Sequence, residues 1–176
     1  SAFVLGSAPV AGADEWGTGD SSTGAHPDAD PHTFCYFSSV TEDMKSGIRE
    51  AEWEALDPTQ ADVNFISSCN LSGSGETDVV WRQGSLSVDG SSFCEDFDGS
   101  NCDQYYVTLD AGNINVGSND EIDESQTACH ELGHTAGLSH GGTSDCMINA
   151  SLSTPPTEVQ FRRYNQHHRD HINAWF

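Results

Sequence analysis

The sequence has few basic residues. Its 176 residues include 6 Lys plus Arg against 28 Asp plus Glu, which gives a formal net charge of −22. Binding to phosphate groups needs a positively charged surface, so this shortage argues against a nucleic acid or an anionic membrane as the partner. We therefore expect a partner that is uncharged or cationic, or a metal ion.

Long apolar runs are also missing. Only 35% of the residues are hydrophobic, and no run approaches the roughly 18 residues that span a bilayer, so we expect no membrane-embedded segment. Residues 1–12 are apolar but have no basic flank, so they are neither a complete signal peptide nor a transmembrane start. We expect a mature form from which the targeting signal and any pro-segment have been removed.

Four Trp, eight Phe and four Tyr argue against disorder.

No pair of cysteines forms a CxxC motif, which argues against a thiolate zinc cage or a thioredoxin-type site. The six cysteines instead favour disulfides and an extracellular location. Six cysteines permit 15 pairings. Their order along the chain suggests one set, in which the pairs are Cys35 with Cys69, Cys94 with Cys102, and Cys129 with Cys146.

The pattern of apolar and turn-forming residues predicts a single domain over residues 32–176, preceded by an acidic, Gly- and Ser-rich arm over residues 1–31. A strand–helix–strand crossover is expected near the start of the domain. The expected strands cover residues 34–37, 62–67, 78–82, 85–88 and 105–109; a helix runs from Ser39 or Thr41 to about Leu56, a loop covers 111–120, a helix begins near Asp123 or Ser125, and a last helix covers 165–175.

One motif carries chemistry. His130 and His134 are four residues apart on the expected helix, so both imidazoles lie on one face and can bind a single metal ion. Glu131 lies about 100° round the helix, which places its carboxylate beside the metal, where it can accept a proton from bound water. Gly137 is suited to the sharp turn that ends the helix and returns His140 to the metal. Three nitrogen ligands leave a fourth position open, as in catalytic zinc sites.

The five-residue HExxH pattern alone also arises on solvated helix faces. Gly137 and His140 extend it to HExxHxxGxxH, and each has a geometric reason of its own, so coincidence becomes much rarer.

With Met147 seven residues after His140, the sequence resembles the metzincin clan of zinc endopeptidases. Residues 130–140 are most similar to matrixins, whereas the small size and residues 172–175 look like the secreted actinomycete neutral proteases related to snapalysin. That group usually has Asp as third ligand, so His140 departs from it. The resemblance is strong over residues 105–149 and implies an α/β (α+β) zincin fold, with a twisted mixed sheet, an active-site helix and a C-terminal helix.

The resemblance implies roles for several residues. His130, His134 and His140 would bind one catalytic Zn²⁺, with Glu131 as general base. Met147 would form the apolar floor of a Met-turn near residues 144–149.

A bridge between Cys129 and Cys146 would then clamp this floor to the helix. The substrate would bind extended along an edge strand, expected near residues 85–88, and the pocket wall would come from about residues 150–160. Ile148 and Asn149 stand where some metzincins have an oxyanion-stabilising Tyr.

Two weaker patterns remain. Oxygen-bearing side chains in the segment 96–103 are spaced as in a Ca²⁺-binding loop, although the closing Glu of an EF-hand is missing. They are Asp96, Asp98, Asn101 and Asp103. The alternative is an acidic hairpin turn closed by Cys94 and Cys102.

In the last helix, a stripe of side chains at helical spacing is expected to pack on the domain. It consists of Tyr164, His168, Ile172 and Trp175.

These patterns predict a secreted, monomeric zinc endopeptidase that hydrolyses proteins or peptides. The alternatives are a non-catalytic zinc-binding or adhesion module and a zinc hydrolase of a non-peptide amide. The acidic composition also resembles that of halophilic proteins, which leads to the hypothesis that activity and stability rise with salt.

Overall fold

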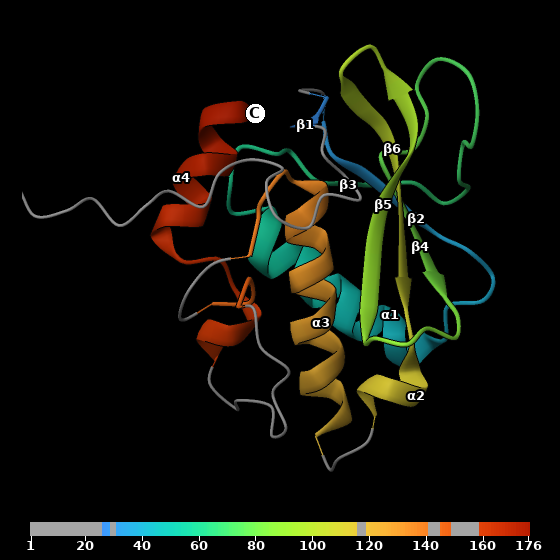
Figure 1. Cartoon of the computed structure of the whole chain (residues 1–176), viewed down its shortest axis with the longest axis vertical. Helices are drawn as coiled ribbons and strands as arrows, with labels where there is room; N and C mark the ends of the chain where they lie inside the picture. Colours follow the sequence, from blue (N-terminus) through green and yellow to red (C-terminus); the bar gives the residue numbers. More distant parts are fainter. Residues whose placement is uncertain (1–25, 29–30, 116–118, 141–144, 149–158) are drawn as a thin grey trace, which may run out of the picture.

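The computed structural model describes residues 26–28, 31–115, 119–140, 145–148 and 159–176 (Figure 1). Most of the expected arm and most of the expected pocket wall at 150–160 therefore lie outside the described residues. The helices and strands are β1 (His26–Pro27), β2 (Thr33–Tyr36), α1 (Glu42–Glu50), η1 (Ala51–Leu56), β3 (Asn64–Phe65), β4 (Val79–Gln83), β5 (Gly90–Asp98), β6 (Asn101–Leu109), α2 (Ala111–Ile114), α3 (Asp120–Thr135), η2 (Val159–Arg162) and α4 (Gln166–Trp175).

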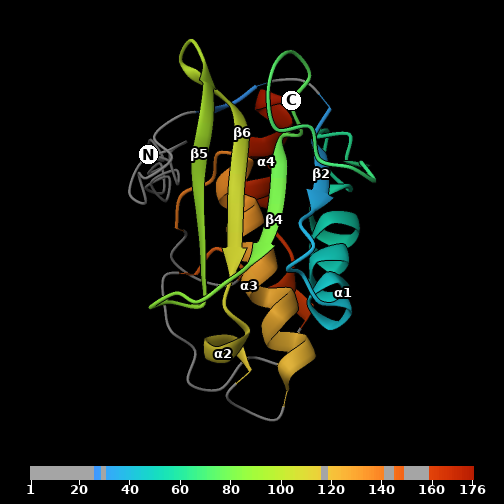
Figure 2. The same ribbon diagram turned by 90° about the vertical axis from the view of Figure 1, so that its right-hand side faces the viewer.

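The strands form one mixed sheet in the order β1-β6-β4-β2-β3, and β5 also pairs with β6. Strand β1 pairs with the first residues of β6 and β4 with the last, whereas β5 pairs along the whole of β6. All neighbours are parallel except β5 and β6, which form an antiparallel hairpin. Figure 2 shows β5, β6, β4 and β2 side by side. Two residues of the expected arm, His26 and Pro27, pair with β6 as β1 and so belong to the sheet.

Helices α1, α3 and α4 lie on one face of this sheet (Figure 2). Alternate residues of a strand point to the same face, so Val79 and Trp81 of β4 enter the core beside Val107 and Leu109 of β6. The helices contribute buried side chains to the same core, which are Met44, Ile48, Leu132 and Ile172. In Figure 1, α3 lies between the sheet and α4, so the helix that carries the HExxH motif is at the centre of the molecule.

Helix α1 begins at the expected cap. The Thr41 hydroxyl accepts a hydrogen bond from the backbone N–H of Met44 at 3.4 Å, and η1 continues the helix in π-helical form to Leu56. Gly47 lets α1 approach α3 closely, because a Cβ atom there would lie 2.9 Å from the backbone carbon of Glu124. This contact fixes how α3 lies against the rest of the core.

The prediction of a strand at residues 85–88 is wrong. The strand that precedes β6 is β5, which begins at Gly90. The backbone of residues 85–88 bonds to the side chains of Asp110, between β6 and α2, and Asn113 of α2 instead of to another strand. Leu86 N donates to Asp110 Oδ2 at 2.7 Å, and the Asn113 amide donates to the carbonyls of Leu86 at 3.2 Å and Val88 at 2.9 Å.

Helical structure is also more extensive than expected. Part of the loop expected at 111–120 forms the short helix α2. Helix α3 begins at Asp120 and not near Asp123 or Ser125, and it has Asp120, Glu121 and Asp123 in its first turn. Acidic side chains there interact favourably with the positive end of the helix dipole, which extends the helix toward its N-terminus.

Three disulfides join the pairs that the order of the cysteines suggested. Cys35–Cys69 joins β2 to the segment before β4, Cys94–Cys102 crosses the β5–β6 hairpin, and Cys129–Cys146 joins α3 to residues 145–148.

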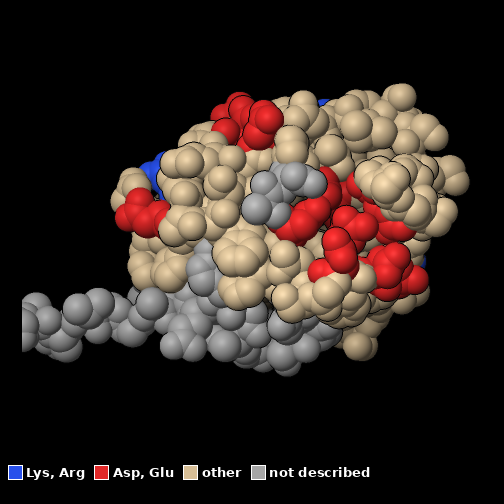
Figure 3. All heavy atoms as spheres, turned by 90° about the horizontal axis from the view of Figure 1, so that it is seen from above, with Lys and Arg blue, Asp and Glu red and all other residues tan. Residues whose placement is uncertain are grey.

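Carboxylates gather at one end of the molecule, shown in Figure 3. One group contains Glu76, Asp96 and Asp103. The pKa of Glu76 is raised mainly by burial and further by the negative charges of Asp96 and Asp103.

No helix among the described residues is long and apolar enough to cross a bilayer.

Candidate metal centre

Three histidines are brought together at the C-terminal end of α3. His130 and His134 lie one turn apart on the helix. The helix ends at Gly137, whose φ of +84° is a conformation that residues with a side chain rarely adopt. The N–H of Leu138 donates to the carbonyl of Gly133 at 2.8 Å and closes this turn, so the chain reverses and returns His140 to the other two rings.

The three imidazole rings form a nearly equilateral triangle. Their centroids are 4.9 Å apart for His130 and His134, 4.8 Å for His130 and His140, and 5.0 Å for His134 and His140. One nitrogen from each ring lies within 4.8 Å of the others, and within the described ranges no other group of three or more His, Cys, Asp or Glu side chains is arranged to hold a metal ion.

Two of the rings are oriented by backbone carbonyls. His130 Nδ1 lies 2.8 Å from the carbonyl of Cys146, and His134 Nδ1 lies 2.8 Å from that of Leu138. A carbonyl only accepts hydrogen bonds, so each Nδ1 carries the proton and each Nε2 offers a lone pair. Burial also lowers the pKa of His134 to about 4, so this ring is neutral near pH 7, as a metal ligand must be.

Glu131 lies beside the triad and is 7% exposed. Its neighbour is Gly90, the first residue of β5, which packs so closely that a Cβ atom there would lie 2.7 Å from Glu131 Cγ and 2.9 Å from Oε1. Strand β5 therefore passes directly over the carboxylate. Sequence reasoning missed Gly90 because no local pattern relates it to a helix residue so far along the chain.

Met147 lies against the same helix and is fully buried. A Cβ atom at Gly133 would lie 2.2 Å from Met147 Sδ. The thioether therefore fills the space that the missing side chain of Gly133 leaves on α3. Of the expected Met-turn segment 144–149, the structure describes residues 145–148. Ile148 is 8% exposed, and Asn149 lies outside the described residues.

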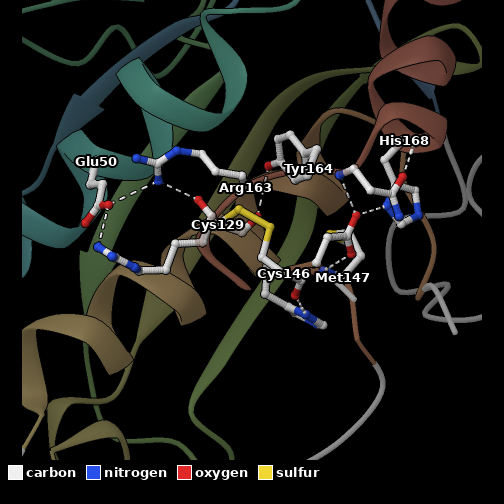
Figure 4. The surroundings of a disulfide bond; sticks show 11 residues. Glu50, Cys129, Cys146, Met147, Arg163, Tyr164 and His168 are labelled. Atoms are coloured by element: carbon white, nitrogen blue, oxygen red, sulfur yellow. Dashed lines mark hydrogen bonds and ion pairs between the residues drawn. A yellow bond between two sulfur atoms is a disulfide. The ribbon is translucent and has the colours of Figure 1, made fainter. Parts of the chain in front are cut away.

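The disulfide between Cys129 and Cys146 is enclosed by contacts from the C-terminal region (Figure 4). Tyr164 donates its hydroxyl hydrogen to the carbonyl of Cys129 at 2.9 Å, and Cys146 N donates to the carbonyl of Arg163 at 3.2 Å. Burial raises the pKa of Tyr164 well above its usual value, so the hydroxyl stays protonated as a donor. Sequence reasoning predicted that Tyr164 packs on the domain but not this bond.

The described residues do not support calcium binding at segment 96–103. These residues form the tip of the β5–β6 hairpin, closed by Cys94–Cys102 as in the alternative interpretation. Asp96 Oδ1 accepts from the N–H of Phe97 at 2.8 Å, and the other candidate ligands, Asp98, Asn101 and Asp103, do not join it in a metal-binding group.

No family model and no curated protein matches the sequence. Among solved structures, the chain is similar to the crystal structure of archaemetzincin from Methanopyrus kandleri, with a TM-score of 0.52 and 14% sequence identity. The similarity covers 85% of this chain and 94% of that chain. It shows the fold alone, a mixed α/β fold of the metzincin type, and the expected fold class is confirmed.

Proposed function

We propose that this metzincin-like fold is a zinc-dependent endopeptidase in which His130, His134 and His140 bind the metal. The observation that carries the proposal is the triangle of imidazoles, in which two Nδ1 atoms are anchored to carbonyls so that Nε2 is left to bind a metal. Three neutral imidazoles suit Zn²⁺ and leave one position open for chemistry.

Glu131 is proposed as the general base and acid. When bound, zinc would polarise the scissile carbonyl and lower the pKa of a water molecule to about 7. The Glu131 carboxylate, held under β5 beside the triad, would accept the proton of the attacking water and deliver it to the departing amine. A site that only binds zinc for stability has no use for this carboxylate.

The substrate is proposed to bind along β5. Among the described strands, β5 pairs only with β6, and its first residue touches Glu131. An extended peptide could add to the other edge of β5 by backbone hydrogen bonds, which places a peptide bond near the base. This mode fits a protein or peptide substrate and needs only a monomer.

The finer family features are part of the proposal. Met147 packed against Gly133 supports the role of an apolar floor below the ligands. The three disulfides favour an oxidising compartment, so we propose that the protein is secreted. The matrixin-like zinc motif on a snapalysin-like scaffold remains the proposed affiliation.

Casein digestion tests the proposal. We expect the wild-type protein to degrade casein and o-phenanthroline to stop it, whereas Glu131→Gln should retain one zinc per chain and lose activity by at least about 100-fold. Glu121→Gln removes the same charge from an exposed position of α3 and serves as the control with normal activity.

Other outcomes separate the alternatives. Zinc binding without any digestion favours the non-catalytic module, and hydrolysis restricted to small amides favours the non-peptide hydrolase. Full activity in Glu131→Gln would refute the mechanism.

A further inference from the structure

A buried carboxylate behind the metal centre has no role in the chemistry described above. Asp145 is 2% exposed and His168 of α4 is 1% exposed. Asp145 Oδ1 accepts from Met147 N at 2.9 Å, and Oδ2 accepts from Asn165 N at 2.9 Å and from His168 Nδ1. A buried carboxylate is costly unless it is paired and hydrogen-bonded, and three donors meet that need here.

These bonds fix the backbone on both sides of Cys146. Asp145 holds Met147 N, while Cys146 N donates to the carbonyl of Arg163 at 3.2 Å. Between them, the carbonyl of Cys146 accepts from His130 Nδ1 at 2.8 Å. The position of this carbonyl therefore depends on the turn that Asp145 holds.

The carboxylate is itself anchored to α4. Asn165 caps that helix by accepting from His168 N at 3.0 Å, and the same residue donates its own N–H to Asp145. His168 lies on the side of the disulfide away from Glu50, as Figure 4 shows. A continuous set of hydrogen bonds, buried at Asp145, thus runs from α4 through Asp145 and the Cys146 carbonyl to a ring of the triad.

We propose that Asp145, held by His168, is a positioning residue of the metal centre, which sets the Cys146 carbonyl and through it the orientation of the His130 ring. This inference rests on the proposed zinc function. Hydrogen-bond partners of metal-ligating histidines fix ring orientation and tautomer, and their loss weakens metal binding by about 10- to 100-fold.

Asp145→Asn is the direct test. An amide has one oxygen acceptor in place of two, so at least one of the three donors loses its partner. We expect the zinc dissociation constant, measured by competition with a chromophoric chelator, to rise by about 10- to 100-fold. The absorption spectrum of the Co²⁺-substituted protein should also change, because it reports ligand geometry.

Asp78→Asn is the matched control. Asp78 is a carboxylate that is 8% exposed, and it accepts hydrogen bonds from the backbone and hydroxyl of Thr33. Its loss should leave zinc affinity and the Co²⁺ spectrum unchanged. Wild-type affinity and spectrum in folded Asp145→Asn would overturn the inference.

A second pair of variants decides the matter if Asp145→Asn does not fold. His168→Leu removes the donor to Asp145, whereas His168→Asn places an amide N–H near the former Nδ1. We expect weaker zinc binding in His168→Leu and recovery in His168→Asn. Equal affinities in both variants and the wild type would refute the role of Asp145. Failure of the wild type itself to bind zinc would instead refute the proposed function.

Discussion

Position 90 has no side chain, and the carboxylate of Glu131 occupies the space that a side chain would need. In Gly90→Ala, the new Cβ would lie 2.7 Å from Glu131 Cγ. The long Glu131 side chain can move aside at little cost in stability, but it then leaves the place from which the proposed mechanism transfers protons. We therefore expect kcat to fall by about 100-fold or more, with unchanged zinc content and melting temperature.

Gly84→Ala is the control for this prediction. Its Cβ would meet only the methyl group of Thr108, at 3.3 Å, so activity should stay normal. Normal turnover in Gly90→Ala would mean that the base works from another position than the one seen beside β5.

The grouping of the three histidines with Glu131 could be predicted from sequence because one helix and one turn fix their relation. His130, Glu131 and His134 share α3, and the positive φ of Gly137 determines the return of His140. The role of Asp145 behind them could not be predicted. Asp145 lies beside the Cys146 carbonyl that contacts His130, but its carboxylate is held by Asn165 and His168, and such contacts between distant segments depend on how the helices pack.

Segment η1 is fixed to the sheet by one buried hydrogen bond. Trp81 Nε1 of β4 donates to Glu52 Oε1 at 2.8 Å, and Glu52 is fully buried. Burial raises the pKa of Glu52 from 4.5 to about 8, although the bond from Trp81 opposes the rise. The carboxyl group is therefore protonated in the folded protein near pH 7.

This pKa predicts how stability depends on pH. The folded state holds the Glu52 proton more tightly than the unfolded state, so its contribution is complete below about pH 4.5 and is lost as the pH rises through about 8. Glu52→Gln keeps an acceptor for Trp81 and cannot ionise. We expect the melting temperature of the variant, relative to that of the wild type, to rise by on the order of several degrees between pH 5 and pH 9.

Comparing the two proteins removes the contribution of groups that titrate in both. A difference in melting temperature that stays constant between pH 5 and pH 9, measured by circular dichroism, would contradict the raised pKa of Glu52.

Elements with strong local signals could be predicted, and those that depend on partners could not. Thr41, Met44 and Ile48 are close in sequence and indicate α1. The alternating residues 85–88 resemble a strand, yet the side chains of Asp110 and Asn113 take their backbone hydrogen bonds. Strand β5 is largely polar and has Ser92 as its only buried residue, so its pattern is weak, and its pairing with β6 defines it.

Over the whole molecule, the chain has only six Lys and Arg residues, and at least three of them are bonded to carboxylates. Arg162 and Arg163 both bond to Glu50, at 2.6 and 3.1 Å. Lys45 bonds to Glu42 at 2.7 Å, and the guanidinium of Arg82 lies 4.1 Å from the centroid of the Tyr106 ring. Six basic residues against 28 acidic residues leave a net charge of −22, so the carboxylates mainly repel one another.

Salt should therefore stabilise the folded protein. The screening length falls from about 10 Å at 0.1 M to about 3 Å at 1 M ionic strength, and repulsion across the surface falls with it. We expect the melting temperature to rise by several degrees between low salt and about 1 M NaCl, with most of the rise at the lower concentrations. Activity on casein should rise in parallel.

A melting temperature that is flat or falls with NaCl would reject this hypothesis. The acidic surface in Figure 3 would then be better explained by attraction of cationic substrates, and cleavage of Lys- and Arg-rich peptides should slow as salt is added.

The class of the molecule could be predicted from its sequence, but the arrangement of its strands could not. Alternating strands and helices indicate a mixed α/β domain. The strand order β1-β6-β4-β2-β3 includes β1, whose two residues lie in a segment without a strand pattern. Trp175 Nε1 donates to the carbonyl of Pro27 at 2.8 Å, and the indole stacks on His26 at 4.4 Å, so the far end of the chain helps to place this strand.

The disulfide between Cys129 and Cys146 has a topological consequence. His130, His134 and His140 all lie between the two cysteines, so the bond closes a covalent ring that contains the entire ligand set. A single backbone cut inside that ring leaves all three histidines covalently linked. For the proposed peptidase, the disulfide would therefore keep the three histidines on one covalent ring after such a cut.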